Sequence, residues 1–165
     1  MYDHIIEYKF EKNLKEIEYI DGEPLSLSEK FIFYHNKNKF RKDITRLQNV
    51  FKNFTKNSLV ASGIRDSYIK AEYSEKFLLI LFTTGDQVEK TNEILEKHLK
   101  KDIQQDYFYL VADSTYMLLL AKDINGLISG IDIMEEIFTQ TFNDYMEQKQ
   151  FDDFIKICQF KIYSN

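Results

Sequence analysis

The sequence has no tryptophan and contains one cysteine, one proline, five glycines and three histidines among its 165 residues. The single cysteine, Cys158, excludes an intrachain disulfide, a cysteine-rich zinc site and a CxxC redox pair. So little proline and glycine argues against a turn-rich sandwich and against a disordered chain. The histidines, His4, His35 and His98, are scattered and form no His-Glu-x-x-His motif, so we expect surface or half-buried residues rather than metal ligands.

Targeting and membrane segments are also missing. No run approaches the roughly twenty apolar residues of a membrane span, and residues 1–10 are charged and lack the apolar centre of a secretory signal. These absences favour a soluble product that does not enter a membrane. A signal removed from a longer secreted enzyme would leave the same sequence, so the compartment stays open.

The charge balance disfavours nucleic acid as a partner. The chain has 22 basic and 27 acidic residues, a formal net charge of −5, whereas phosphates require a basic face. Two local basic clusters do occur. Because acidic residues lie near both, we interpret them as solvated helix ends rather than a polyanion site; they are Lys37, Lys39, Arg41 and Lys42, and Lys97, Lys100 and Lys101.

What the chain does have is apolar residues, 44% of the total, enough for one α+β domain over residues 1–165. Apolar side chains at intervals of four, three, four and three predict a helix within residues 38–54, and a second is expected at 87–103. We expect a turn at Asp21-Gly22 and interrupted pairing at Pro24. Strands are expected within residues 5–10, 17–20, 31–34, 59–64, 68–73 and 76–82, with another near 160–163.

Residues 107–138 are the most informative segment. Two apolar runs, 107–111 and 116–120, flank the turn residues Asp113-Ser114 and predict a hairpin whose second strand is central. Asp123 or Asn125 can cap the helix that follows. Its apolar face consists of Leu127, Ile131, Met134 and Phe138, widened by Ile128 and Ile137. Gly126 and Gly130, four residues apart, would let this helix approach the sheet closely.

This segment resembles the end of the N-terminal α/β domain of glycoside hydrolases that act on N-acetylhexosamines, the family 20 β-hexosaminidases and the family 84 hyaluronidase or O-GlcNAcase-like enzymes. The resemblance lies in an Ala-x-Asp-x-x-Gly-x-x-x-Gly helix entry, here Ala121, Asp123, Gly126 and Gly130. Only about thirty residues carry it specifically. The chain departs from the family at residues 127–129, where an aromatic is usual, and at 132–134, where a Gln-Thr-Leu-like continuation is usual.

The resemblance implies a mixed β-sheet with about three helices packed mainly on one face, in a zincin-like topology without a metal site. It also implies a non-catalytic accessory domain that packs against the catalytic (β/α)₈ barrel of the same or a partner chain. Such a barrel takes about 250 residues, for which this chain has no room. No residue here inherits a catalytic, cofactor-binding or metal-binding role, and no cofactor is expected.

Other chemistry is weakly supported by the residues themselves. Asp152-Asp153 and Glu135-Glu136 are adjacent carboxylates that point about 100° apart on a helix, so neither pair suits the two-carboxylate mechanism of a glycosidase. We interpret them as solvated helix charge. Cys158 is expected to be a small buried hydrophobe, and a nucleophile–base pair with His98 is the weaker interpretation because neither lies in a motif.

Two alternatives stay open. A stand-alone α+β interaction or oligomerisation domain, including one that forms a homo-oligomer, would show the same patterning, as would a small enzyme with no recognisable motif. The accessory-domain hypothesis carries one structural expectation of its own. Part of residues 151–163 should lack cover when the chain is isolated from a partner.

Overall fold

The computed structural model describes residues 3–27, 32–35, 41–55, 61–63, 77–82, 97–98, 101–148 and 155–165. These residues form one mixed sheet and two helices with defined bounds, so the α+β class is confirmed, while the described helices with defined bounds are two where about three were expected. Residues 97 and 98 are helical and belong to the helix expected at 87–103. Residues 101–103 are not helical, and residues 87–96, 99 and 100 lie outside the described residues.

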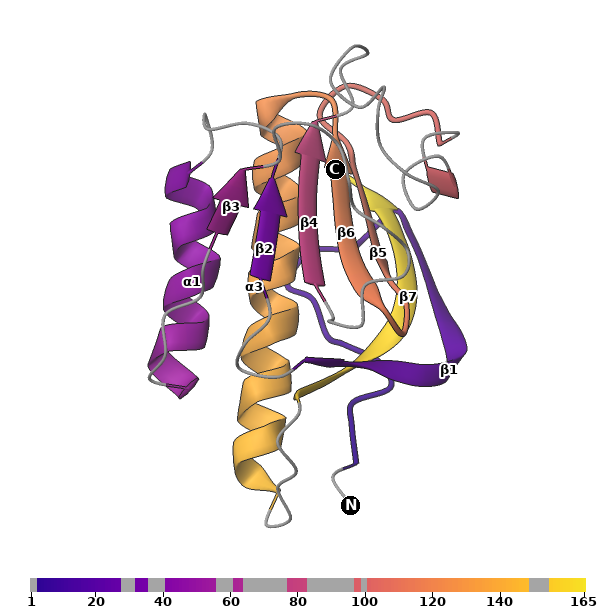
Figure 1. The fold of residues 1–165 in the computed structure, drawn as a ribbon. Coiled ribbons are helices and arrows are strands. Elements are labelled where there is room, and N and C mark those ends of the chain that lie inside the picture. Colours follow the sequence, from indigo (N-terminus) through magenta and orange to yellow (C-terminus); the bar gives the residue numbers. More distant parts are fainter. Residues whose placement is uncertain are drawn as a thin grey trace.

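The sheet has seven strands in the order β1-β7-β5-β6-β4-β2-β3 (Figure 1). Neighbours from β1 to β6 are antiparallel, and neighbours from β6 through β4 and β2 to β3 are parallel. The strands are β1 (Glu16–Leu27), β2 (Ile32–His35), β3 (Ala61–Gly63), β4 (Phe77–Phe82), β5 (Phe108–Ala112), β6 (Tyr116–Ala121) and β7 (Ile155–Ser164). The helices are α1 (Arg41–Thr55) and α3 (Ile124–Glu147).

The predicted hairpin is confirmed as β5 and β6. Asp113 organises its turn, because its Oδ1 accepts hydrogen bonds from the amides of Thr115 at 2.7 Å and Tyr116 at 2.9 Å. Every residue of both strands is buried. Since successive side chains point to opposite faces, this sheet is covered on both sides at its centre.

Asp123 caps α3, as one of the two predicted candidates. Its Oδ1 accepts from the Gly126 amide at 2.8 Å and its Oδ2 from the Asp106 amide at 2.8 Å. Asn125 has a different role, since its Nδ2 donates to Asp106 Oδ1 at 3.0 Å. Asp106 adopts a left-handed φ of 64°, so the carboxylate of Asp123 holds both the helix start and the bend before β5.

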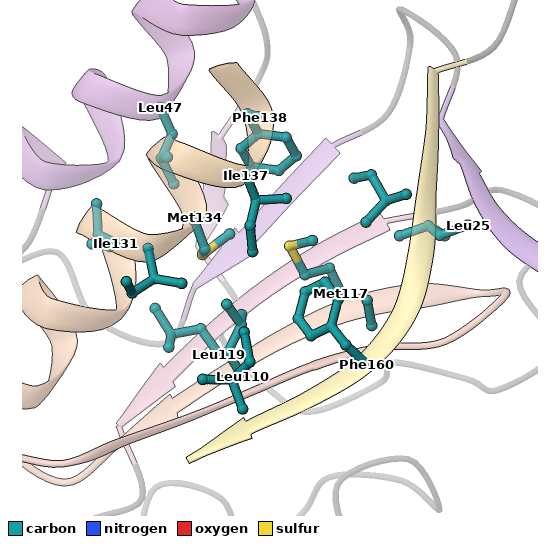
Figure 2. Packing of buried hydrophobic residues seen from close by; sticks show 14 of the residues in the cluster. Leu25, Leu47, Leu110, Met117, Leu119, Ile131, Met134, Ile137, Phe138 and Phe160 are labelled. Atoms are coloured by element: carbon teal, nitrogen blue, oxygen red, sulfur yellow. The ribbon is translucent and has the colours of Figure 1, made fainter. Parts of the chain in front are cut away.

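Both helices contribute to one core on the same face of the sheet. Figure 2 shows Ile131, Met134 and Ile137 of α3 facing Met117 and Leu119 of β6. The predicted stripe is buried except for Ile128, which is half-buried. The helix predicted within residues 38–54 is α1, whose buried positions are Ile44, Leu47 and Phe51. Phe51 packs edge-on against Phe138 and Phe142 of α3, with ring centroids 4.7 and 4.8 Å apart.

The close approach of α3 to the sheet depends on the two predicted glycines. A Cβ atom on Gly126 would overlap the carbonyl oxygen of Tyr107, and one on Gly130 would overlap the Leu119 side chain. The carbonyl belongs to the backbone and cannot rotate away, whereas the atoms met at Gly130 belong to a side chain.

Two predictions near the N-terminus are wrong. Residues 5–10 are not a strand, because the amides of Lys9 and Glu11 bond to side chains of α3 instead of to a neighbouring strand. The chain does not reverse at residues 21–22 either, since β1 continues to Leu27 and pairs with β7 on both sides of them. The predicted interruption is present, because pairing with β7 shifts register between Ile20 and Leu25, on either side of Pro24.

Further along, β2, β3 and β4 confirm the strands expected at residues 31–34, 59–64 and 76–82, and β4 lies inside the sheet as predicted. The strand expected at residues 68–73 lies outside the described residues.

The expectation of an uncovered C-terminal segment is wrong for the part that is described. β7 is longer than the predicted strand and pairs with β1 on one side and β5 on the other. Ile155, Ile157, Phe160 and Ile162 are buried in the core. Residues 151–154 lie outside the described residues. Both edges of β7 are thus paired within this chain.

We expect Gly126→Ala to lower the free energy of unfolding by about 1–3 kcal/mol, the usual cost of overpacking against a rigid group. Gly130→Ala should cost less, because Leu119 can shift and alanine favours a helix by about 1 kcal/mol over glycine. Urea denaturation measures both, with Ser129→Ala on the half-buried side of α3 as the control. A Gly126→Ala protein as stable as Gly130→Ala would contradict the close approach at Tyr107.

Candidate functional site

The first cluster of titratable side chains is buried against the sheet. His98 Nε2 lies 2.7 Å from the hydroxyl oxygen of Tyr116, and the two residues are only 6% and 4% exposed. The imidazole also lies near the Tyr109 ring, with centroids 6.1 Å apart. Tyr109 and Tyr116 belong to the face opposite the helices, so His98 covers part of that face. The expectation of a surface or half-buried His98 is therefore wrong.

Burial governs the protonation of this cluster. It lowers the pKa of His98 below its ordinary value of 6.5, aided by the charges of Lys97 and Lys161 and opposed by Asp113. Burial, with Asp113 as the second cause, raises the pKa of Tyr116. At neutral pH the pair is thus a neutral imidazole and a neutral phenol joined by a hydrogen bond. Because both groups are buried, this hydrogen bond joins the helical residues 97–98 to the β5–β6 hairpin.

Cys158 does not pair with His98. The thiol is buried in the core on the helix-covered face, whereas His98 contacts side chains of the opposite face. The sheet therefore separates the two groups. Burial raises the pKa of the Cys158 thiol to about 11, opposed by a hydrogen bond with the Tyr8 side chain. This supports the predicted role of a small buried hydrophobe.

The second candidate is an open groove of about 570 Å³ between α1, α3 and the N-terminal residues before β1. Its main charged group is Arg46, whose Nη2 lies 2.7 Å from Asp132 Oδ1 and 2.8 Å from Glu135 Oε2. These three side chains are 37–49% exposed, so the ion pairs contribute only about 0–1 kcal/mol each. The groove is lined by Lys9, Glu11, Lys12, Arg46, Asp132, Ile133, Glu135, Glu136, Thr139 and Gln140.

The two carboxylates of Glu135 and Glu136 have different partners. Glu135 bonds to Arg46, whereas Glu136 Oε1 accepts from the backbone amide of Glu11 at 3.1 Å. The groove thus uses its acidic side chains to join its own walls, which is the arrangement of a structural contact and not of a two-carboxylate glycosidase site. Asp152 and Asp153 lie outside the described residues.

Metal and polyanion chemistry have little support where the structure can be read. Among the described residues, no three His, Cys, Asp or Glu side chains gather as metal ligands would. His4 is half-buried, and the side chain of His35 lies outside the description. Of the two basic clusters, Lys101 is already engaged. Its Nζ lies 4.3 Å from the Tyr163 ring centroid and 3.7 Å from Glu16 Oε2. Within the described ranges, no helix has the length and apolarity to cross a bilayer.

No family model matches the chain, and no curated protein matches it. Several solved structures share its fold. CpGH84D aligns with a TM-score of 0.63 and 16% identity, over 96% of this chain and 24% of that one. The β-N-acetylhexosaminidase from Bacteroides fragilis NCTC 9343 aligns with a TM-score of 0.52 and 13% identity, over 93% and 24%. A chitobiase from Flavobacterium johnsoniae, FjGH20, aligns with a TM-score of 0.52 and 10% identity, over 92% and 20%.

The structural neighbours are thus GH84 and GH20 hexosaminidases, the two families that residues 107–138 resemble. At such low identity the likeness establishes the fold alone. The chain spans about a quarter or less of the length of each of these structures.

The buried His98 predicts a pH dependence of stability. In the unfolded chain His98 takes a proton as the pH falls through 6.5, whereas the folded state keeps it neutral to a lower pH. The unfolded state then binds more protons, so the free energy of unfolding should fall between about pH 7 and about pH 5. His98→Gln keeps a polar end for Tyr116 and should reduce this loss, as measured by urea denaturation across that range.

His4 supplies the control for this experiment. Burial also lowers the pKa of His4, but this side chain is less buried than His98 and lies near the N-terminus. His4→Gln should therefore remove a smaller part of the loss. An unchanged pH profile in His98→Gln would show that the imidazole titrates alike in both states.

Proposed function

We propose that the chain is a non-catalytic accessory domain that packs against the catalytic barrel of a β-N-acetylhexosaminidase-like glycoside hydrolase. In this proposal residues 1–165 are a single domain with the zincin-like topology implied by the resemblance. The observation that carries it is the unequal coverage of the fold match. Nearly all of this chain, 96%, corresponds to only 24% of CpGH84D, so most of the larger protein has no counterpart here.

The described titratable groups support the same conclusion. The His98–Tyr116 pair is buried, Cys158 is on the other side of the sheet, and Glu135 and Glu136 bond to separate partners. A catalytic constellation instead requires side chains that converge on an accessible point. The described part of the chain provides a folded scaffold with polar helix surfaces.

The surface that meets the barrel is not the C-terminal strand. β7 already pairs on both edges and is buried in the core, so it has no free edge to offer. Contact with a barrel must use one of the outer surfaces, either the solvent side of α1 and α3 or the polar part of the opposite face. On that face β7 presents Gln159, Lys161 and Tyr163, none of which is fully buried.

The proposal predicts that this chain, purified alone, does not hydrolyse an aryl N-acetylglucosaminide, because the acid and its partner would reside on the barrel. The matched measurement is the mass of the native polypeptide in its source cells. A covalently attached barrel adds about 250 residues or more. If the barrel is a partner chain, the native protein should copurify with it and with N-acetylhexosaminidase activity.

Turnover by the isolated chain would overturn the accessory role. The accessory role would also be overturned by a native polypeptide of this length that copurifies with no barrel-containing chain. In that case the interaction or oligomerisation domain becomes the leading interpretation.

A further inference from the structure

The segment before β1, residues 3–15, has no regular secondary structure and lies across α3 and the end of β7 (Figure 1). We call it the N-terminal strap. Tyr8 is its one buried residue, at 6% exposed. Ile5, Phe10 and Leu14 pack against the core only in part, and Ile6 is 71% exposed. The strap therefore buries little apolar surface for its length.

Side chains of α3 hold the centre of the strap. The amide group of Gln140 clasps the backbone of Lys9, since its Oε1 accepts from the Lys9 amide at 2.9 Å and its Nε2 donates to the Lys9 carbonyl at 2.7 Å. One helical turn away, Glu136 accepts from the Glu11 amide at 3.1 Å. These bonds are exposed, and each depends on a single surface side chain.

The far end of the strap is tied to the end of β7. Lys12 Nζ donates to the Asn165 carbonyl at 2.7 Å, and the Lys15 amide donates to Ser164 Oγ at 3.1 Å. These contacts also pair side chains with backbone atoms. The strap is thus held by separate side-chain hydrogen bonds, whereas β1, β7 and β5 are joined by the backbone hydrogen bonds of strand pairing.

Beneath the strap lies an apolar part of the core. Tyr8 packs edge-on against Phe160 with ring centroids 6.3 Å apart, and its hydroxyl lies 3.2 Å from Thr141 Oγ1. The same side chain hydrogen-bonds Cys158, which is 7% exposed. Tyr19 of β1 completes this contact, because its hydroxyl oxygen accepts from the Tyr8 amide at 2.9 Å. Removing Tyr8 from its position would uncover Cys158 and Phe160.

We propose that the N-terminal strap is a releasable cover: residues 3–15 detach from α3 and β7 as a unit, while the sheet and helices stay folded, and expose the apolar core around Phe160 and Cys158. Local opening is favoured where few apolar contacts are buried and hydrogen bonds are solvent-exposed. The strap meets both conditions. The open groove beside it shows that its contact with α1 and α3 is incomplete.

Cys158 is the only cysteine of the chain, so its reaction with a thiol reagent reports on this opening without any substitution. We would measure its alkylation by iodoacetamide in the native chain as a function of low urea concentrations. Release of the strap alone exposes little surface, so the rate should change weakly with urea, in contrast to the steep dependence of global unfolding. Gln140→Ala removes both hydrogen bonds between Gln140 and the Lys9 backbone. It should therefore speed alkylation about tenfold, which corresponds to a free energy of opening lower by about 1.4 kcal/mol.

Arg46→Ala is the matched control. Arg46 lines the same groove as Gln140, but its ion pairs join α1 to α3 and leave the strap untouched. It should not change the alkylation rate at low urea. Equal acceleration by both substitutions would overturn the proposal, because the hydrogen bonds of Gln140 to Lys9 would then affect access to Cys158 no more than the ion pairs of Arg46 do.

Hydrogen exchange of the unsubstituted chain is a second measurement that does not depend on a variant. Peptides from residues 3–15 should exchange together and faster than peptides from β7, which the strap covers. Alkylation that follows global unfolding at all urea concentrations, or strap amides as protected as those of β7, would overturn the proposal. Immediate alkylation without any protection would also overturn it, since the strap would not be covering the thiol.

Discussion

The close contact between α3 and the β5–β6 hairpin is the constraint on which the rest of this structure depends. Gly126 brings the first turn of the helix against the backbone at Tyr107, and Asp123 fixes the direction in which the helix leaves β6. Once α3 lies in this position, α1 packs on it through Phe51, and β7 is placed beside β5 by its pairing. A local arrangement of about thirty residues thus organises elements that are distant in sequence.

This local origin explains which predictions succeeded. The hairpin and the buried stripe of α3 depend on residues close together in the chain, so spacing and turn chemistry were sufficient to predict them, and they narrowed the helix cap to Asp123 or Asn125. The resemblance to hexosaminidase domains also rested on this segment, and the fold comparison led to the same families.

Predictions that depended on distant partners failed for a common reason. Residues 5–10 have the partial alternation of a strand, but Gln140, more than a hundred residues away, bonds to both backbone groups of Lys9. Asp21-Gly22 is turn-like, yet β7 accommodates it as an irregularity within one long strand. The burial of His98 depends on its hydrogen bond with Tyr116, which is 18 residues away, and the residues next to His98 in the sequence do not indicate this partner. No pattern within a short window contains this information.

The edge of the sheet bears on the alternative of self-association. β1 is an edge strand among those described, and it carries Glu16, Glu18, Asp21 and Glu23, all exposed, together with Pro24 at the interruption. Charges, proline and irregular pairing are the features that prevent edge-to-edge association of strands. A homo-oligomer built by pairing two β1 strands is therefore disfavoured, and an oligomer would have to use another surface.

The structure divides into two parts that are held in place by different contacts. Residues of β1, α1, β5, β6, α3 and β7 form most of the described core, to which the N-terminal strap contributes Tyr8 and is otherwise held by separate side-chain bonds. The accessory role concerns the outer surfaces of the first part, and the releasable cover concerns the second. A chain that proves to have no barrel partner would leave the strap contacts as they are. Conversely, a strap that opens only on global unfolding would leave the fold match, and the accessory role that it supports, unchanged.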